Sequence, residues 1–194
     1  MPKWEIDDFI KSKEKWIMDC LALQQDQQEK REAFTIDYGS TITLRGSQYK
    51  ITERGGTMAG FDSEVIYMPP GISPEQIKHT CVKIYKKIAK AFISDRVAFF
   101  APQMGVAPSA IKINSATKRW GSCSSRKSLN FSWRLIMAED NVIDYVVVHE
   151  LAHLVEMNHS ARFWAVVAKV LPDYKERNAQ LKILHKKLSG EDWE

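Results

Sequence analysis

The sequence has few cysteines and no long apolar segment. Cys20, Cys81 and Cys123 are odd in number and widely spaced, which fits a reducing compartment better than a disulfide framework. No apolar run approaches the roughly 20 residues that a transmembrane helix needs. The N-terminal residues MPKWEIDDFI also lack the basic start and apolar core of a signal peptide. We therefore expect a cytoplasmic protein without a membrane partner.

A large excess of charge of either sign is also missing. The 194 residues include 28 Lys and Arg and 24 Asp and Glu, for a net charge of +4. This charge permits an anionic substrate but does not by itself predict nucleic-acid binding. Hydrophobic residues make up 44% of the chain and charged residues 27%, as in ordinary soluble proteins. The length allows one domain with a substantial core, or one domain and a small lobe.

Histidine is scarce, yet three of the five histidines fall within one stretch, YVVVHELAHLVEMNHSARFW. His149 and His153 form an H-E-x-x-H pattern with Glu150 between them. On a helix, residues four apart share a face, so both rings can bind one metal ion. Glu150 lies one position further round and can reach a water on the metal without being a ligand. Apolar residues from 142 to 147 predict a buried helix, where unpartnered histidines would be costly, so a metal site is favoured.

A metal site of this kind needs a third protein ligand and an open position for water. His159, six residues after His153, can supply the ligand if the helix ends near Glu156 and the chain turns back. Glu176, on a later predicted helix, competes for the role, as in proteases whose third ligand is a glutamate. The spacing of His159 is that of the metzincins, but Glu156 replaces their glycine and no methionine of a Met-turn follows. The chain is therefore not a metzincin.

Two segments carry a family resemblance: RWGSCSSRKSLNFSWRL from Arg119 and DYVVVHELAHLVEMNHSARFW from Asp144. They resemble the YgjP-like metallopeptidases, also described as predicted metal-dependent hydrolases, and more distantly the SprT-like and WLM zincin proteases. The similarity is strongest over 110–188 and looser over 9–71. It implies an α+β fold, with a zincin-like catalytic domain whose H-E-x-x-H helix lies beside a small antiparallel sheet. It also favours His159 as third ligand, because the family shares the local N-H-S run. Family members usually carry additional strands before the segment that corresponds to 9–17, so this chain is expected to be a shortened or variant member.

The resemblance places an edge strand, over 120–124, beside the metal helix, where an extended substrate could add as a further strand. Arg119 could supply positive charge to an oxyanion or a phosphate, or be a surface arginine. Cys123 has three interpretations: a nucleophile, a metal ligand in a latent state, or a small buried residue in a tight turn. The predicted substrate-binding residues are Arg119, Trp120, Gly121, Ser122 and Cys123.

Periodicity predicts the remaining elements. An amphipathic packing helix over 4–24 precedes a polar linker or helix tail, then a hairpin of strands 41–44 and 49–52 and a strand over 65–68. Ser73 is expected to cap a helix that runs to about Phe100, with His79 and several lysines on its exposed side. Strands are predicted over 111–114 and 129–135, and helices after His159 and over 174–188, where His185 is expected to be exposed. We expect an N-terminal helix and β lobe over 1–72 and the zincin-like domain over 73–194.

The predicted function is a zinc-dependent hydrolase, interpreted as a metallopeptidase. One Zn²⁺ ion, or another divalent metal, would activate a water, and Glu150 would be the general base. A second hypothesis is a metal-dependent nucleoside triphosphate pyrophosphohydrolase, with phosphates held by Lys118, Arg119, Arg126 and Arg134. A third is a DNA-associated protease or binding module like the SprT-like and WLM proteins. No zinc finger or strongly basic tail supports it.

Overall fold

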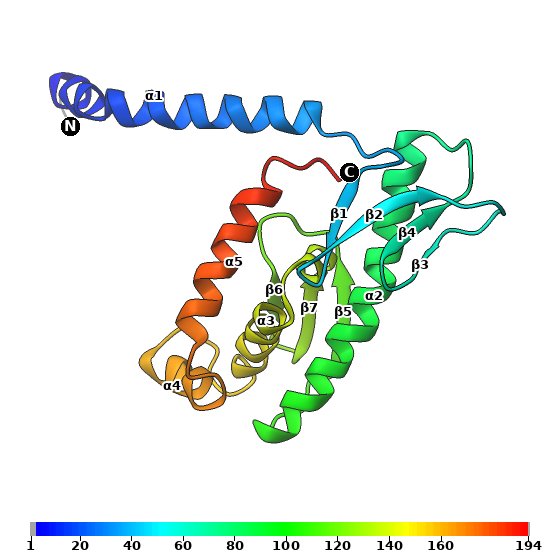
Figure 1. The fold of residues 1–194 in the computed structure, drawn as a ribbon. Helices are drawn as coiled ribbons and strands as arrows, with labels where there is room; N and C mark the ends of the chain where they lie inside the picture. The colour runs from blue at the N-terminus through cyan, green and yellow to red at the C-terminus, as the bar shows by residue number, and fades with distance from the viewer. Residues whose placement is uncertain (1–2, 194) are drawn as a thin grey trace. The chain divides into compact units, whose positions relative to one another are not determined.

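The computed structural model describes residues 3–193, apart from the side chain of residue 7 (Figure 1). The chain separates into two compact units, one of residues 1–35 with 185–194 and the other of 36–184. The predicted division into 1–72 and 73–194 does not coincide with these units and stays a prediction. Within 3–193, no helix combines the length and apolar character that crossing a membrane requires.

The first unit is built on α1, Lys3–Ala33. The polar segment predicted as a linker or helix tail is helical, because side-chain pairs four residues apart, such as Lys30 with Asp26, support it. At the end of α1, the ring of Phe34 lies 5.3 Å from that of buried Trp193. The sequence predicted that the apolar face of this helix packs against other residues. Within this unit it does not, since Phe9 and Trp16 on that face are 60% and 65% exposed.

The second unit begins with a four-stranded sheet in the order β1-β2-β4-β3. Its strands are β1 (Thr41–Leu44), β2 (Ser47–Glu53), β3 (Gly60–Phe61) and β4 (Val65–Met68). β1 and β2 form the predicted antiparallel hairpin, and β4 pairs parallel with β2. β3 was not predicted, because two residues are too few to show strand alternation.

Helix α2, Pro74–Gln103, follows this sheet. The predicted capping box is present: Ser73 accepts from the backbone of Gln76, and the Gln76 side chain accepts from the backbone of Ser73. The buried face repeats at helical spacing and comprises Ile77, Cys81, Tyr85, Ala89, Ile93, Val97, Phe100 and Ala101. His79 is exposed, as predicted. α2 thus supplies one wall of the core against which the helix with the H-E-x-x-H pattern packs.

A second sheet, in the order β5-β7-β6, follows α2. Its strands are β5 (Ala110–Asn114), β6 (Gly121–Cys123) and β7 (Ser128–Ser132). The predicted α+β class is confirmed, but this sheet is mixed and not wholly antiparallel, since β7 runs parallel to β5 and antiparallel to β6. The strand predicted to reach Leu135 ends at Ser132. This residue is the N-cap of the 3-10 helix η1, Trp133–Met137, and its hydroxyl accepts a hydrogen bond from Arg134 N.

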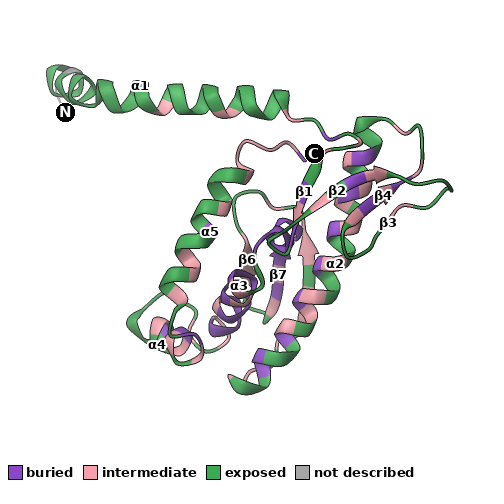
Figure 2. Ribbon diagram, in the orientation of Figure 1, coloured by how far each residue is buried: buried purple, intermediate pink, exposed green. Residues whose placement is uncertain are grey.

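Three helices complete the second unit: α3 (Asp140–Ala152), α4 (Ala161–Val170) and α5 (Tyr174–Leu188), of which the last continues into the first unit. Figure 2 shows α3 as a largely buried helix. The β1–β2 turn holds its N-terminus: Arg45 donates twice to Asp140, and Arg45 N donates to Ile136 O. At the other side, Arg177 of α5 donates to Asn141 O, 2.9 Å away. The helix that carries the H-E-x-x-H pattern is thus fixed from two sides.

Candidate metal centre

The residues of the candidate metal site begin in the last turn of α3. The helix is apolar on nearly every face, which buries it, so that Glu150 is buried and His149 half-buried. It ends at Ala152, with His153 as its C-cap, so the chain leaves the helix at the second histidine of the pattern. The helix thus ends four residues before Glu156, where the sequence predicted its end, and the loop that follows returns His159 to the helix.

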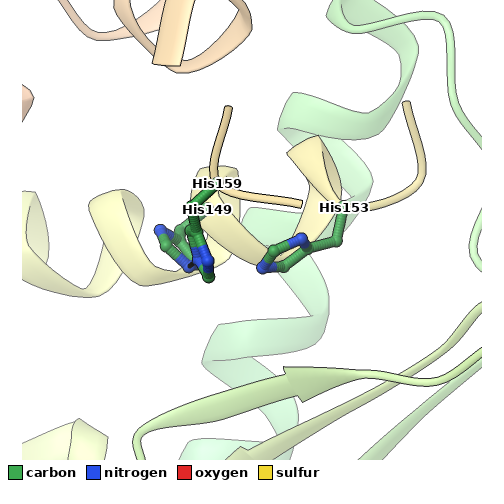
Figure 3. Close-up of side chains that lie close together, drawn as sticks. All are labelled: His149, His153 and His159. Atoms are coloured by element: carbon green, nitrogen blue, oxygen red, sulfur yellow. Dashed lines mark hydrogen bonds between the residues drawn. The ribbon is translucent and has the colours of Figure 1, made fainter. Parts of the chain in front are cut away.

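Three histidines converge at this point (Figure 3). The ligand atoms that His149, His153 and His159 offer all lie within 4.8 Å of one another. Nε2 of His159 is 3.0 Å from Nε2 of His149. Nδ1 of His153 lies 3.3 Å from Glu156 O, and a hydrogen bond from Nδ1–H to this carbonyl leaves Nε2 free to bind a metal. This is the sole group of such donors found within 3–193.

The histidine group fits a metal of the zinc type. Two nitrogens at a tetrahedral angle around zinc are about 3.3 Å apart, close to the spacing of the His149 and His159 Nε2 atoms. Burial, and then the neighbouring His153 and His159, lower the pKa of His149 to about 3, so this ring stays neutral, as a ligand must be. Imidazole nitrogens suit zinc, copper, iron and nickel better than magnesium or calcium.

Glu150 lies next to this group and is 5% exposed. Burial raises its pKa to about 8, and the positive charge of Arg119 opposes this shift. Its Oε2 is buried and accepts no hydrogen bond from the described residues. A buried carboxylate oxygen without a donor is costly, so a proton or a bound water is its natural partner. Glu150 is therefore suited to exchange a proton beside the histidines.

Strand β6 packs directly against Glu150. A Cβ placed on Gly121 would lie 2.5 Å from Glu150 Oε1 and 2.7 Å from Cδ, so only glycine leaves room for the carboxyl group. In the antiparallel pair, Trp120 O accepts from Ser132 N and Ser124 N donates to Ser128 O. Because bonded positions alternate along a strand, Gly121 and Cys123 direct their N–H and C=O groups to the opposite edge of β6. This edge has no strand partner among the described residues, so it can accept an extended chain.

Replacing Gly121 by Ala should disable the site without removing its metal ligands. The new methyl group would overlap the Glu150 carboxyl group. We expect turnover to fall by at least about tenfold, because a misplacement of about 1 Å can cost roughly 100-fold. Steady-state kinetics and zinc content of the purified variant test this expectation. Gly55→Ala is the matched control, because a Cβ there meets nothing within 4 Å. Full activity of Gly121→Ala would mean that Glu150 is not held by this contact.

Metal-free protein should show the raised pKa of Glu150 as a pH-dependent stability. The ordinary pKa is 4.5 and the folded value about 8, so between these values the folded state holds a proton that the unfolded chain has lost. Stability therefore falls as pH rises through this window, by up to about 1.4 kcal/mol per pH unit. Glutamine does not titrate, so Glu150→Gln does not lose stability in this way. The free energy of unfolding of the variant in urea, minus that of wild type, should therefore be larger at pH 8 than at pH 5. The same difference at both pH values would contradict the raised pKa.

The other predicted substrate residues lie around β6. Arg119 is exposed and close enough to Glu150 to affect its pKa, whereas Trp120, Ser122 and Cys123 are half-buried. Burial, and then the nearby charge of Glu150, raise the pKa of the Cys123 thiol, which makes it a poor nucleophile. Its sulfur is also absent from the ligand group found in 3–193. These observations disfavour the first two interpretations. The third is met only in part, because Cys123 is half-buried at the end of β6, just before the turn closed by Lys127 N and Ser124 O.

Two further candidate residues, Arg134 and Glu176, lie outside the histidine group. Arg134, predicted to hold phosphate, is 7% exposed, donates to Ser115 O at 2.9 Å and lies over the Trp133 ring. These contacts tie Arg134 into the fold and disfavour its predicted role as a phosphate ligand. Glu176 is exposed on α5 and does not belong to the ligand group, which contains His159 instead.

Sequence reasoning missed one part of the site, an aromatic pair at the start of α4. The Phe163 ring lies within 5 Å of all three histidine rings, and Trp164 lies 5.9 Å from those of His149 and His159. The sequence shows that Phe163 and Trp164 lie four and five residues after His159, which is the only signal of their closeness to the site. From this position we predicted only a helix with an apolar face.

Comparisons with known proteins identify a family and two solved structures that the chain resembles. A sequence model of a family described as "YgjP-like, metallopeptidase domain" matches residues 1–184. No curated protein matches the chain. The metallopeptidase zymogen abylysin of Pyrococcus abyssi is 23% identical, with a TM-score of 0.44 over 47% of this chain and 92% of that one. The zymogen jannalysin of Methanocaldococcus jannaschii is 22% identical, with a TM-score of 0.42 over 49% and 96%.

Proposed function

Because the chain belongs to the YgjP-like metallopeptidase family, we propose that it is a zinc-dependent peptidase with Glu150 as its general base. One observation carries the proposal. A buried carboxyl group with an unpartnered oxygen lies beside three converging imidazoles and beneath the free edge of β6. These are the parts that hydrolysis of an extended peptide requires: a metal site, a base and a place to align the chain.

Each residue has a defined part in this proposal. His149, His153 and His159 would hold the zinc ion, which supplies a Lewis acid that polarises the scissile carbonyl and acidifies the attacking water. The free backbone groups of Gly121 and Cys123 would align the substrate as an added strand. Glu150 would accept a proton from the attacking water and pass it to the leaving amine. The charge of Arg119 favours the ionised form of Glu150, which is the form that accepts this proton.

The contacts of Arg134 favour a peptide over a nucleotide substrate, because they remove one of four proposed phosphate ligands. Lys118, Arg119 and Arg126 are exposed, so a direct test is warranted. Zinc-loaded protein should be assayed against an unfolded protein and against the four nucleoside triphosphates. We expect peptide cleavage that Glu150→Gln lowers by roughly 10²–10⁴-fold and that triphosphates do not alter. Pyrophosphate release that depends on Glu150 would keep the site but replace the substrate.

A further inference from the structure

A single buried side chain touches all three proposed ligands. The ring centroid of Phe163 lies 4.9 Å from that of His149, 4.6 Å from His153 and 4.7 Å from His159. Phe163 is fully buried, so its ring has few alternative positions. The three histidines come from the last turn of α3, its C-cap and the following loop, and Phe163 is a common surface behind them.

The start of α4 fixes where this ring lies. Ser160 is the N-cap of α4, and its hydroxyl accepts from Phe163 N at 3.4 Å. His159 immediately precedes this cap, so the turn that places the third histidine also places the ring behind it. Trp164 packs edge-on against Phe163, with ring centroids 5.1 Å apart, and itself stacks on Tyr174 at 5.2 Å. The Phe163 ring is thus held by both backbone and side-chain contacts.

Hydrogen bonds alone do not orient these histidines. A histidine that binds a metal usually donates its second ring nitrogen to a carbonyl or carboxylate, which fixes the ring. His153 has such a partner in Glu156 O, but Nδ1 of His149 is buried with no partner among the described residues. Apart from the 3.0 Å contact of its Nε2 with His159, the His149 ring is therefore oriented by packing.

We infer that Phe163 is a positioning residue that orients the three histidines for metal binding. The inference rests on the proposed function, since it assumes that these histidines bind a metal ion. Phe163 would act through ring packing only, with no contact to substrate. Its effect should therefore appear first in metal affinity and coordination geometry, before any change in the substrate's KM.

The test compares Phe163→Leu with Phe100→Leu in the full chain. Phe100 is a buried phenylalanine of α2 whose ring contacts Phe99 and Arg96, not the histidines. Zinc affinity is measured by competition with a chelator, and coordination geometry by the d–d spectrum of the cobalt(II)-loaded protein. We expect Phe163→Leu to weaken zinc binding roughly 10–100-fold, the usual effect of removing a partner that orients a ligand. Its cobalt spectrum should change, while Phe100→Leu keeps wild-type values for both.

Urea unfolding of the metal-free variants separates this role from loss of the fold. If Phe163→Leu is the less stable of the two, Phe163→Met, which better preserves volume, carries the comparison. Wild-type affinity and an unchanged cobalt spectrum in the Phe163 variant would overturn the inference while leaving the proposed function intact. Failure of the wild-type protein to bind zinc would instead overturn the proposed function.

Discussion

Replacing Glu150 by Gln should lower turnover by roughly 10²–10⁴-fold while zinc stays bound, because a positioned general base contributes a factor of this size. Glutamine matches the shape of the side chain, which fills the space beside Gly121, but cannot accept the water's proton. The three histidines are unchanged, so the metal content should be that of wild type. Kinetics with a cleavable peptide and zinc content of the same sample measure both parts.

The matched control for this variant is Glu53→Gln. Glu53 is an exposed residue of β2 and lies outside the ligand group, so its replacement should change neither rate nor zinc content. Wild-type turnover in Glu150→Gln would remove Glu150 from the mechanism. Loss of both zinc and activity would mean instead that Glu150 supports the metal site.

Replacing His159 by Ala should abolish tight zinc binding, with a loss larger than the roughly 10–100-fold that removal of an orienting partner costs. A catalytic zinc site needs three protein ligands, and the variant would retain only His149 and His153. Glu176→Ala should bind zinc as wild type does, because Glu176 is exposed and lies outside the ligand group. Zinc affinity from chelator competition distinguishes the two variants.

His79→Ala is the control for the third-ligand experiment, since His79 is an exposed histidine of α2 outside the ligand group. Its zinc affinity should equal that of wild type. If Glu176→Ala loses zinc and His159→Ala retains it, the ligand set is the His-His-Glu type, and the loop with His159 must rearrange when the metal binds.

Local signals in the sequence were sufficient for much of this fold. The Ser73 capping box, the hairpin around Arg45 and Gly46, and the buried helix before His149 each depend on residues close together in the chain. The spacing of His149, His153 and His159 likewise indicated a shared site, because helix geometry and one turn relate them. The structure brings these three together as predicted.

Features that depend on distant pairing were not predictable in this way. Strands β5 and β7 come before and after β6 in the sequence and pair in parallel. No local pattern in the sequence distinguishes this pairing from an antiparallel one. The burial of Arg134 follows from the carbonyl of Ser115 and the Trp133 ring, whereas the sequence shows only a basic residue. The role of Phe163 is of the same kind, since an apolar helix position predicts burial but not which side chains it touches.

Diffraction from crystals of the zinc-loaded protein, recorded at the zinc absorption edge, tests the central claim most directly. Anomalous scattering locates zinc independently of any assumed ligand. We predict one peak per chain, within about 2.0–2.1 Å of a ring nitrogen of each of His149, His153 and His159. A peak elsewhere, or no peak between these histidines, would contradict the assignment of this site as the metal centre.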